Sequence, residues 1–236
     1  MCIPWWKRFL SYIAPMPITS IKTKINPQLK LRMANGRLQL STPKAIYSYD
    51  ELYDNYYKLF RVTDLRNTPI RQVLLLGFGM GSIPYMLERS FKKLYQYTAV
   101  ELDEGIIQLA RKYAIPRLKS NIHLVEGDAT EFVKQLSQVY EMICVDIFVD
   151  DIIPPTAESI AFLEAMKPYI SKEGSIFYNR LYRSDEDKAE SKQYFRTVFL
   201  NVFPDAQAID VEGNLILVSN PLILKPGAQD MVLFEY

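Results

Sequence analysis

The stretch RQVLLLGFGMGSIPYMLER, residues 71–89, constrains the fold most strongly. Four consecutive apolar residues run into Gly77, Gly79 and Gly81, and a helical pattern follows. A continuous apolar run is typical of a strand that is buried on both faces of a sheet. Glycines permit a tight turn and leave room for a ligand beside the backbone, while the helix that follows offers free N–H groups. The stretch therefore predicts a buried strand, a glycine bend that can hold a ligand, and a helix.

The rest of the chain continues this alternation. Helical patterns at 81–92, 104–113, 129–138 and 157–170 separate the apolar runs VLLLGF, YTAVEL, NIHLVEG, YEMICVDIF and SIFYNRL. This order predicts an α/β fold with a doubly wound, mostly parallel sheet. A helix at about 185–201, followed by AQAIDV and GNLILVSN, predicts a C-terminal antiparallel hairpin, and DMVLFEY is a further candidate strand.

The N-terminal part has a different pattern. Residues 18–49 alternate as β-strands do, and Asn35-Gly36 is a strong hairpin signal, so we expect a small β-hairpin unit followed by a helix at about 49–63. We therefore predict two domains, 1–65 and 66–236. The first 49 residues hold eight Lys and Arg and no Asp or Glu. A membrane-surface anchor and a nucleic-acid arm are alternatives, but the cations are scattered, so we expect contacts with an acidic body in a homodimer and no nucleic acid.

Composition excludes several classes of protein. No apolar run approaches the roughly 18 residues that cross a bilayer, and the N-terminus does not read as a signal peptide, so we expect a cytoplasmic protein without stable membrane insertion. Cys2 and Cys144 lie far apart and Cys144 is in an apolar run, which disfavours a disulfide. His123 is the one histidine. We therefore predict no metal site and no catalytic triad.

Acidic side chains follow the predicted strands one after another. Glu101 ends the second strand, Asp128 follows the third, and Asp146 follows the fourth. The carboxyl ends of parallel strands meet at one edge of the sheet, so these groups should converge with the glycine bend. A carboxylate at the position of Glu101 can accept the hydroxyls of a ribose. Asp103 has two alternatives: it contacts a ligand, or it is a first-turn acid of the next helix.

Asp150 and Asp151 follow in the next loop and add to the negative charge. Such a rim repels a diphosphate and favours a ligand that carries a nucleoside and a positive charge. A phosphate loop of the NTPase kind is excluded because no Gly-Lys-Ser/Thr follows the glycines.

These segments resemble the spermidine synthase-like branch of the class I S-adenosylmethionine-dependent transferases. The resemblance covers roughly residues 20–220 and rests on VLLLGFGMGS, VELDEGIIQLARKY, IHLVEGDATEFV and YEMICVDIF. It implies a Rossmann-like fold with a seven-stranded sheet, and a donor that is S-adenosylmethionine or its decarboxylated form. It also implies that Glu101 holds the ribose, that Asp128 with Ala129 holds the adenine, and that Asp146 is the catalytic residue.

The chain departs from this family pattern around the acceptor. Met80 replaces the aspartate that binds the aminopropyl group, Ala45 replaces a glutamine, and Val149 replaces the second aspartate of the catalytic loop. Residues 54–56 read Asp-Asn-Tyr where Tyr-His-Glu is expected. We still expect a small-molecule acceptor, with an amine as one candidate, because aromatic rings and carboxylates can hold a cation. The candidate contacts are Tyr49, Asp50, Asp150 and Asp151, with Tyr47, Tyr53, Tyr56 and Tyr57 as further candidates for which a core or interface role is favoured.

Three functions are consistent with these observations. The first hypothesis is methyl transfer from S-adenosylmethionine to an unknown acceptor, because the donor residues are kept while those that hold a polyamine are mostly lost. The alternative within enzymes is an aminopropyltransferase that uses decarboxylated S-adenosylmethionine. The third is a non-catalytic protein that binds a nucleoside or serves as a scaffold.

Overall fold

The computed structural model describes residues 3–228. The candidate strand DMVLFEY lies outside this range. The described chain divides into two compact units. Within the described residues, unit 1 contains 3–53, 77–128 and 148–152, and unit 2 contains 54–76, 129–147 and 153–228. Because the units interleave along the chain, each is described by itself, and the boundary after residue 65 stays a prediction.

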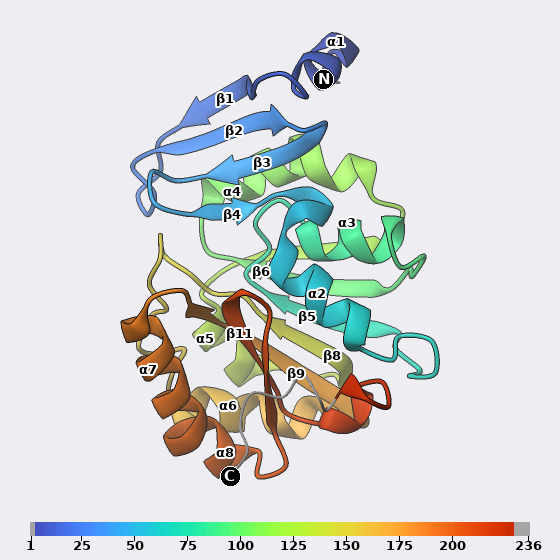
Figure 1. Cartoon of the computed structure of the whole chain (residues 1–236), viewed down its shortest axis with the longest axis vertical. Helices are drawn as coiled ribbons and strands as arrows, with labels where there is room; N and C mark the ends of the chain where they lie inside the picture. The colour runs from blue at the N-terminus through green and yellow to red at the C-terminus, as the bar shows by residue number, and fades with distance from the viewer. Residues whose placement is uncertain (1–2, 229–236) are drawn as a thin grey trace. The chain divides into compact units, whose positions relative to one another are not determined.

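Unit 1 begins with helix α1 (Trp5–Leu10) and a four-stranded antiparallel sheet in the order β1-β2-β3-β4. Its strands are β1 (Met16–Ile21), β2 (Leu29–Ala34), β3 (Arg37–Ser41) and β4 (Ile46–Ser48). Asn35 and Gly36 both have positive φ, 49° and 73°, as the tight hairpin between β2 and β3 requires. The predicted hairpin is thus confirmed within a larger sheet, and α1 lies beside β1 and β2 (Figure 1).

The remaining elements of unit 1 follow the glycine bend. They are α3 (Ser82–Arg89), β6 (Gln96–Glu101), α4 (Glu104–Leu109), the π-helical η2 (Ala110–Ala114), the 3-10 helix η3 (Ile115–Arg117) and β7 (Asn121–Glu126). β6 and β7 pair in parallel. A further 3-10 turn, η1 (Asp50–Leu52), replaces the start of the helix expected from residue 49, because Asp50 adopts φ 46° and breaks the pattern.

Unit 2 contains the strands β5 (Gln72–Leu76) and β8 (Tyr140–Val145), which are buried along almost their whole length. Its other elements up to β9 are α2 (Asp54–Val62), α5 (Ala129–Phe132), η4 (Val133–Gln135), α6 (Ile160–Met166), η5 (Lys167–Tyr169) and β9 (Ile170–Tyr182). β8 pairs in parallel with both β5 and β9. The apolar runs of β5 and β8 are almost wholly buried, as a sheet covered on both faces requires.

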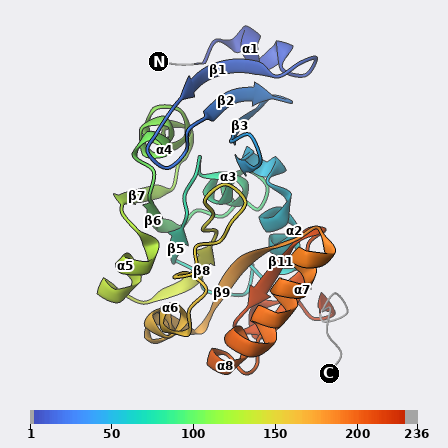
Figure 2. The ribbon, with the colours of Figure 1, turned by 90° about the vertical axis from the view of Figure 1, so that its left-hand side faces the viewer.

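The C-terminal part of unit 2 forms the predicted antiparallel hairpin. It comprises α7 (Asp185–Tyr194), the π-helical η6 (Phe195–Phe199), α8 (Leu200–Val202), β10 (Gln207–Asp210), β11 (Gly213–Val218) and η7 (Pro221–Ile223). β11 is antiparallel to both β9 and β10. Helix α7 runs alongside β9 (Figure 2).

The strands form one seven-stranded sheet in the order β10-β11-β9-β8-β5-β6-β7. From β5 the chain adds β6 and β7 on one side, and it then returns to add β8 and β9 on the other. The strand order therefore reverses between β5 and β8, the point beyond which open α/β sheets bind their ligands. The predicted α/β fold with a mostly parallel, doubly wound sheet is confirmed. Among residues 3–228 no helix has the length and apolar character needed to span a membrane.

Candidate active site

The glycine bend directly follows β5 and leads into α3. Gly77, Gly79 and Gly81 have φ of 92°, 54° and 68°, a region that side chains with a Cβ rarely adopt. A Cβ at Gly79 would lie 3.3 Å from the backbone oxygen of Tyr47, and one at Gly81 would lie 2.9 Å from the ring of Phe78. The bend therefore needs glycine for its conformation, and at Gly79 also for the close approach of β4.

Glu101 lies against this bend. Its Oε2 accepts the backbone N–H of Gly79 at 2.9 Å, and its Oε1 accepts those of Leu102 and Asp103 at 2.9 and 3.1 Å. Burial raises the pKa of Glu101, and the three N–H donors oppose this shift. A carboxylate has about four acceptor positions, so one remains for a ligand hydroxyl once three N–H groups are bound. Glu101 thus fits the ribose contact that the sequence predicts.

Asp103 has a different environment. It is 2% exposed, and its Oδ1 caps α4 by accepting the backbone N–H of Gly105 at 2.9 Å. Its Oδ2 accepts the hydroxyl of Thr23 at 2.5 Å and the amide of Asn26 at 2.8 Å. Of the two alternatives for Asp103, this geometry favours the helix-capping one, since both oxygens are already occupied.

Asp128 and Ala129 follow β7. The backbone N–H of Gly127 donates to the carbonyl of Glu101 at 3.0 Å, which carries the β6–β7 pairing up to the residue before Asp128. Asp128 is exposed and ends unit 1, whereas Ala129 is buried and begins α5 in unit 2. Asp128 therefore stands at the same end of the paired strands as Glu101, and the adenine contact of Asp128 and Ala129 stays a prediction.

Asp146 directly follows β8 in unit 2. Its backbone N–H donates to the carbonyl of Leu76 at 2.8 Å, so it stands where β5 and β8 both end. The amide of Asn179 donates to its Oδ1 at 2.8 Å, and Asn214 in turn donates to Oδ1 of Asn179 at 2.9 Å. This pair of asparagines orients the carboxylate. Neither asparagine is among the residues that the sequence predicts for the site. The signal that could identify Asn179 is its polar side chain inside the apolar run SIFYNRL.

The sequence also did not predict the hydrogen bonds that hold the loop at 148–152 within unit 1. The backbone N–H of Asp150 donates to the hydroxyl of Tyr47, which itself donates to Oδ1 of Asn26 at 2.9 Å. Burial raises the pKa of Tyr47 to about 12. The Asp150 carboxylate accepts the hydroxyl of Thr42 and lies 3.8 Å from the ammonium of Lys44. Tyr47 thus tethers this loop to β4.

The remaining candidate acceptor contacts divide into two groups. Asp50 is 1% exposed and accepts two hydrogen bonds from Arg117 at 3.0 and 2.6 Å, so its carboxylate is already paired, and its contact with an acceptor stays a prediction. Tyr56 is also fully buried, and its hydroxyl donates to the carbonyls of Val145 and Phe177, which is the core role that the sequence favoured. Tyr49 is half-buried and bonds Asn35 at 2.9 Å, and Asp151 is half-buried in the loop.

The spermine/spermidine synthase domain model matches residues 59–209, which include the glycine bend, Glu101, Asp128 and Asp146. The chain belongs to this family. The chain is similar to a polyamine aminopropyltransferase from Vibrio vulnificus (strain CMCP6). The two are 27% identical over 171 residues, which make up 71% of this chain and 56% of that protein. The chain spans about half the length of the curated relatives that it matches.

Solved structures are similar to the chain in fold. A spermidine synthase from Thermotoga maritima has a TM-score of 0.66 at 14% identity and covers 93% of this chain and 79% of its own. Human methyltransferase-like protein 13 in complex with SAH has a TM-score of 0.54 at 22% identity, covering 75% of this chain and 79% of its own. At such identities these two neighbours establish the shared fold.

Proposed function

We propose that this member of the spermine/spermidine synthase family transfers an aminopropyl group from decarboxylated S-adenosylmethionine to an amine. The observation that carries the proposal is the match of the family to residues 59–209. The curated relatives that match are named polyamine aminopropyltransferases, which supports aminopropyl transfer over methyl transfer. The expectation from sequence ranked methyl transfer first, so this proposal reverses that order.

The contacts of Glu101 support the donor part of the proposal. Its carboxylate is fixed by Gly79 at the bend and keeps one acceptor position, where a ribose hydroxyl would bind. Asp128 and Ala129 are the proposed adenine contacts. The donor, when bound, supplies a sulfonium centre that activates the adjacent carbon. The chain supplies the binding site and the orientation for this chemistry.

Asp146 is the proposed catalytic residue. In the reaction the acceptor nitrogen forms a bond to the carbon next to sulfur, the carbon–sulfur bond breaks, methylthioadenosine leaves, and the nitrogen loses a proton. A carboxylate of ordinary pKa, ~4, is a weak base for an ammonium. We therefore assign Asp146 chiefly to orienting the amine and stabilising its positive charge, and Asn179 to positioning Asp146 through their 2.8 Å hydrogen bond.

Methyl transfer is the second candidate, and Met80 favours it. This side chain is 2% exposed in the glycine bend, where the resemblance leads us to expect an aspartate for a cationic propylamine. An apolar thioether offers no charge to that amine. Val149, which replaces the second aspartate of the catalytic loop, also favours methyl transfer. The donor is then S-adenosylmethionine itself, held by the same Glu101 contact.

Product analysis separates these functions. We would incubate the full chain with each donor and a panel of diamines and polyamines and identify products by mass spectrometry. Aminopropyl transfer gives methylthioadenosine and an extended amine from the decarboxylated donor, whereas methyl transfer gives S-adenosylhomocysteine from the other. Tight nucleoside binding without turnover on either donor would contradict both and would favour the non-catalytic alternative. The homodimer stays a prediction that sedimentation analysis would test.

A further inference from the structure

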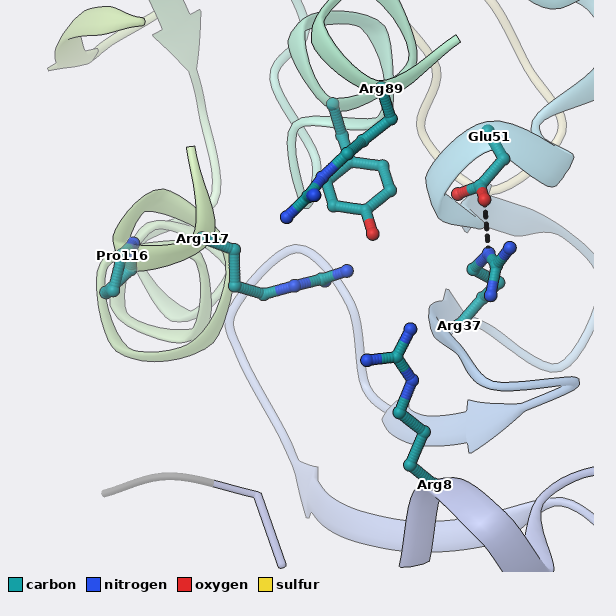
Figure 3. A pocket seen from close by; sticks show the side chains of 7 residues that line it. Arg8, Arg37, Glu51, Arg89, Pro116 and Arg117 are labelled. Carbon is teal, nitrogen blue, oxygen red and sulfur yellow. Dashed lines mark hydrogen bonds and ion pairs between the residues drawn. The ribbon is translucent and has the colours of Figure 1, made fainter. Parts of the chain in front are cut away.

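Unit 1 contains a cavity of about 540 Å³ whose lining includes none of the residues of the proposed donor site. It is lined by Arg8, Arg37, Glu51, Tyr85, Arg89, Pro116 and Arg117. Four of these seven residues are arginines, and they come from α1, β3, α3 and η3 (Figure 3). Such a concentration of one charge from four separate elements requires an explanation.

Arg117 is held rigidly at the wall of this cavity. Both of its terminal nitrogens donate to Asp50, at 3.0 and 2.6 Å, and its guanidinium stacks over the ring of Tyr85 with 4.4 Å to the centroid. Asp50 is itself fixed, because it is 1% exposed and also accepts the backbone N–H of Leu38 at 2.9 Å. A buried carboxylate and an aromatic ring thus preorganise this arginine before any ligand arrives.

The other three arginines surround the same space. Glu51 accepts a hydrogen bond from Nε of Arg37 at 2.5 Å, and Arg89 lies over the ring of Tyr85 at 5.6 Å. Figure 3 shows Arg8 and Arg117 extending toward each other across the cavity. Within residues 3–228, neither Arg8 nor Arg89 has an ion-pair partner. The lining therefore has more positive charge than Glu51 and the adjacent Asp50 neutralise.

From this geometry we infer that the cavity binds a compact molecule that carries phosphate. Guanidinium groups match phosphate oxygens in geometry and charge, and a phosphate between Arg8, Arg89 and Arg117 would relieve their mutual repulsion. The volume lies within the roughly 300 to 1,000 Å³ of small-molecule sites, so the ligand is a small molecule or a headgroup. Glu51 lies on the wall and is paired with Arg37, which limits its repulsion of an anion.

The phosphate cavity is separate from the proposed donor site along α3. That helix starts next to Gly81 at the glycine bend and has eight residues, a length of about 12 Å. The cavity takes Tyr85 from the middle of α3 and Arg89 from its last position. The cavity lining includes none of the proposed donor residues, and the inference does not depend on the proposed function.

Calorimetric titration of the full chain with pyrophosphate tests the inference. We expect saturable binding, weakened about tenfold by Arg89→Gln and by Arg8→Gln, because each removes a charged hydrogen-bond donor. Both side chains are exposed and make no ion pair in the described part of the chain, so the variants should fold. Arg66→Gln is the matched control, since Arg66 is an exposed arginine outside the cavity lining. Binding of methylthioadenosine should be unchanged in all three variants.

A second experiment decides whether the phosphate belongs to a small molecule or to a lipid headgroup. Vesicles of phosphatidylcholine with and without phosphatidic acid are sedimented with the wild type and Arg89→Gln. The protein could bind the acidic vesicles in an arginine-dependent way and fail to bind pyrophosphate. This result would assign the phosphate to a lipid headgroup and support the inference. Equal weakening of pyrophosphate binding by Arg66→Gln would show unspecific attraction and overturn it. Absence of binding to both pyrophosphate and the acidic vesicles would also overturn the inference.

Discussion

The backbone N–H of Gly79 donates a hydrogen bond to Oε2 of Glu101 at 2.9 Å, which joins the glycine bend to the end of β6. The bend follows β5, and Glu101 ends the strand that lies next to β5 in the sheet. The same carboxylate is the proposed ribose contact. A single side chain thus holds the bend and keeps an acceptor position for the proposed nucleoside.

We expect Glu101→Gln to weaken the binding of methylthioadenosine by about 10- to 100-fold, because a hydrogen bond to a charged group is worth about 1.5 to 3 kcal/mol. The variant should fold, since a neutral side chain avoids the burial penalty that raises the pKa of Glu101. However, its amide nitrogen cannot replace an oxygen as acceptor for the three backbone N–H groups. Calorimetric titration measures the change. Glu104→Gln, at an exposed acid in the first turn of α4, is the control. Unchanged affinity in Glu101→Gln would remove this residue from the donor site.

The pKa of Glu101 also predicts how nucleoside binding depends on pH. Its pKa is raised above the ordinary value of 4.5, chiefly by burial, so the carboxylate takes up a proton at a higher pH than an exposed glutamate does. Protonation removes an acceptor, and binding should therefore weaken as the pH falls through the raised pKa. The contribution of this group to folding stability has the opposite sign: it is present at low pH and lost as the pH rises through that pKa.

Titration of methylthioadenosine at a series of pH values measures this dependence. Glu101→Gln should flatten the low-pH part of the profile, because the amide does not titrate. A profile that is the same in the variant and the wild type would assign the dependence to another group.

Asp103→Ala should destabilise unit 1. The substitution removes the cap of α4 and leaves Thr23 and Asn26 without their shared acceptor. Loss of an N-cap costs about 0.5 to 2 kcal/mol and an unsatisfied buried group costs about 1 to 3 kcal/mol, so we expect a loss of about 1.5 to 5 kcal/mol in the free energy of unfolding. Urea denaturation measures it.

Asp185→Ala, at an exposed acid in the first turn of α7, should change this free energy by less than about 0.5 kcal/mol. The folded fraction of Asp103→Ala should bind methylthioadenosine as the wild type does. A large loss of affinity with little loss of stability would instead make Asp103 a ligand contact.

These contacts show how far the sequence predicts this molecule. The apolar runs of β5 and β8 and the Asn35-Gly36 turn were sufficient for the fold, because apolar patterning and turn preference are local properties of the sequence. The partners of Asp103 and Asp50 were not predictable in this way. Asp103 bonds Thr23, which is 80 residues away, and Asp50 bonds Arg117, which is 67 residues away.

These pairings join residues that are far apart in the sequence, so they depend on how the folded segments pack. Residue spacing along the chain does not encode this packing. The sequence therefore identified carboxylates near the strand ends without showing which ones were already neutralised. It placed Glu101 among the donor contacts and Asp50 among the acceptor contacts, without showing that Asp50 is paired with Arg117.

Tyr47→Phe should loosen the loop at 148–152. The hydroxyl of Tyr47 is the acceptor for the backbone N–H of Asp150, and Phe removes it while keeping the ring. A neutral hydrogen bond contributes about 0.5 to 1.5 kcal/mol, so the exchange rate of the Asp150 amide should rise roughly 2- to 10-fold. Hydrogen exchange followed by mass spectrometry measures it. Tyr49→Phe, which loses a bond to Asn35 instead, should leave this loop unchanged.

Asp146→Asn should lower kcat by about 10²- to 10⁴-fold, the range for a positioned acid or base, while leaving donor affinity within about twofold. The reason is that Asp146 is assigned to the acceptor amine, whose charge an amide does not stabilise. Asn179→Ala should lower kcat less, by about tenfold, because the carboxylate remains but loses the 2.8 Å hydrogen bond that orients it.

Rates of methylthioadenosine release at saturating donor measure both effects, once the donor and acceptor are identified. As a positioning residue, Asn179 should be rescued in part by Asn179→Gln, whose amide can still donate, whereas a merely structural defect would not be. Asp205→Asn, at an exposed aspartate of unit 2, controls for the change of charge. Full activity of Asp146→Asn would transfer the catalytic assignment to another group, and Asp150 and Asp151 in the tethered loop would be tested next.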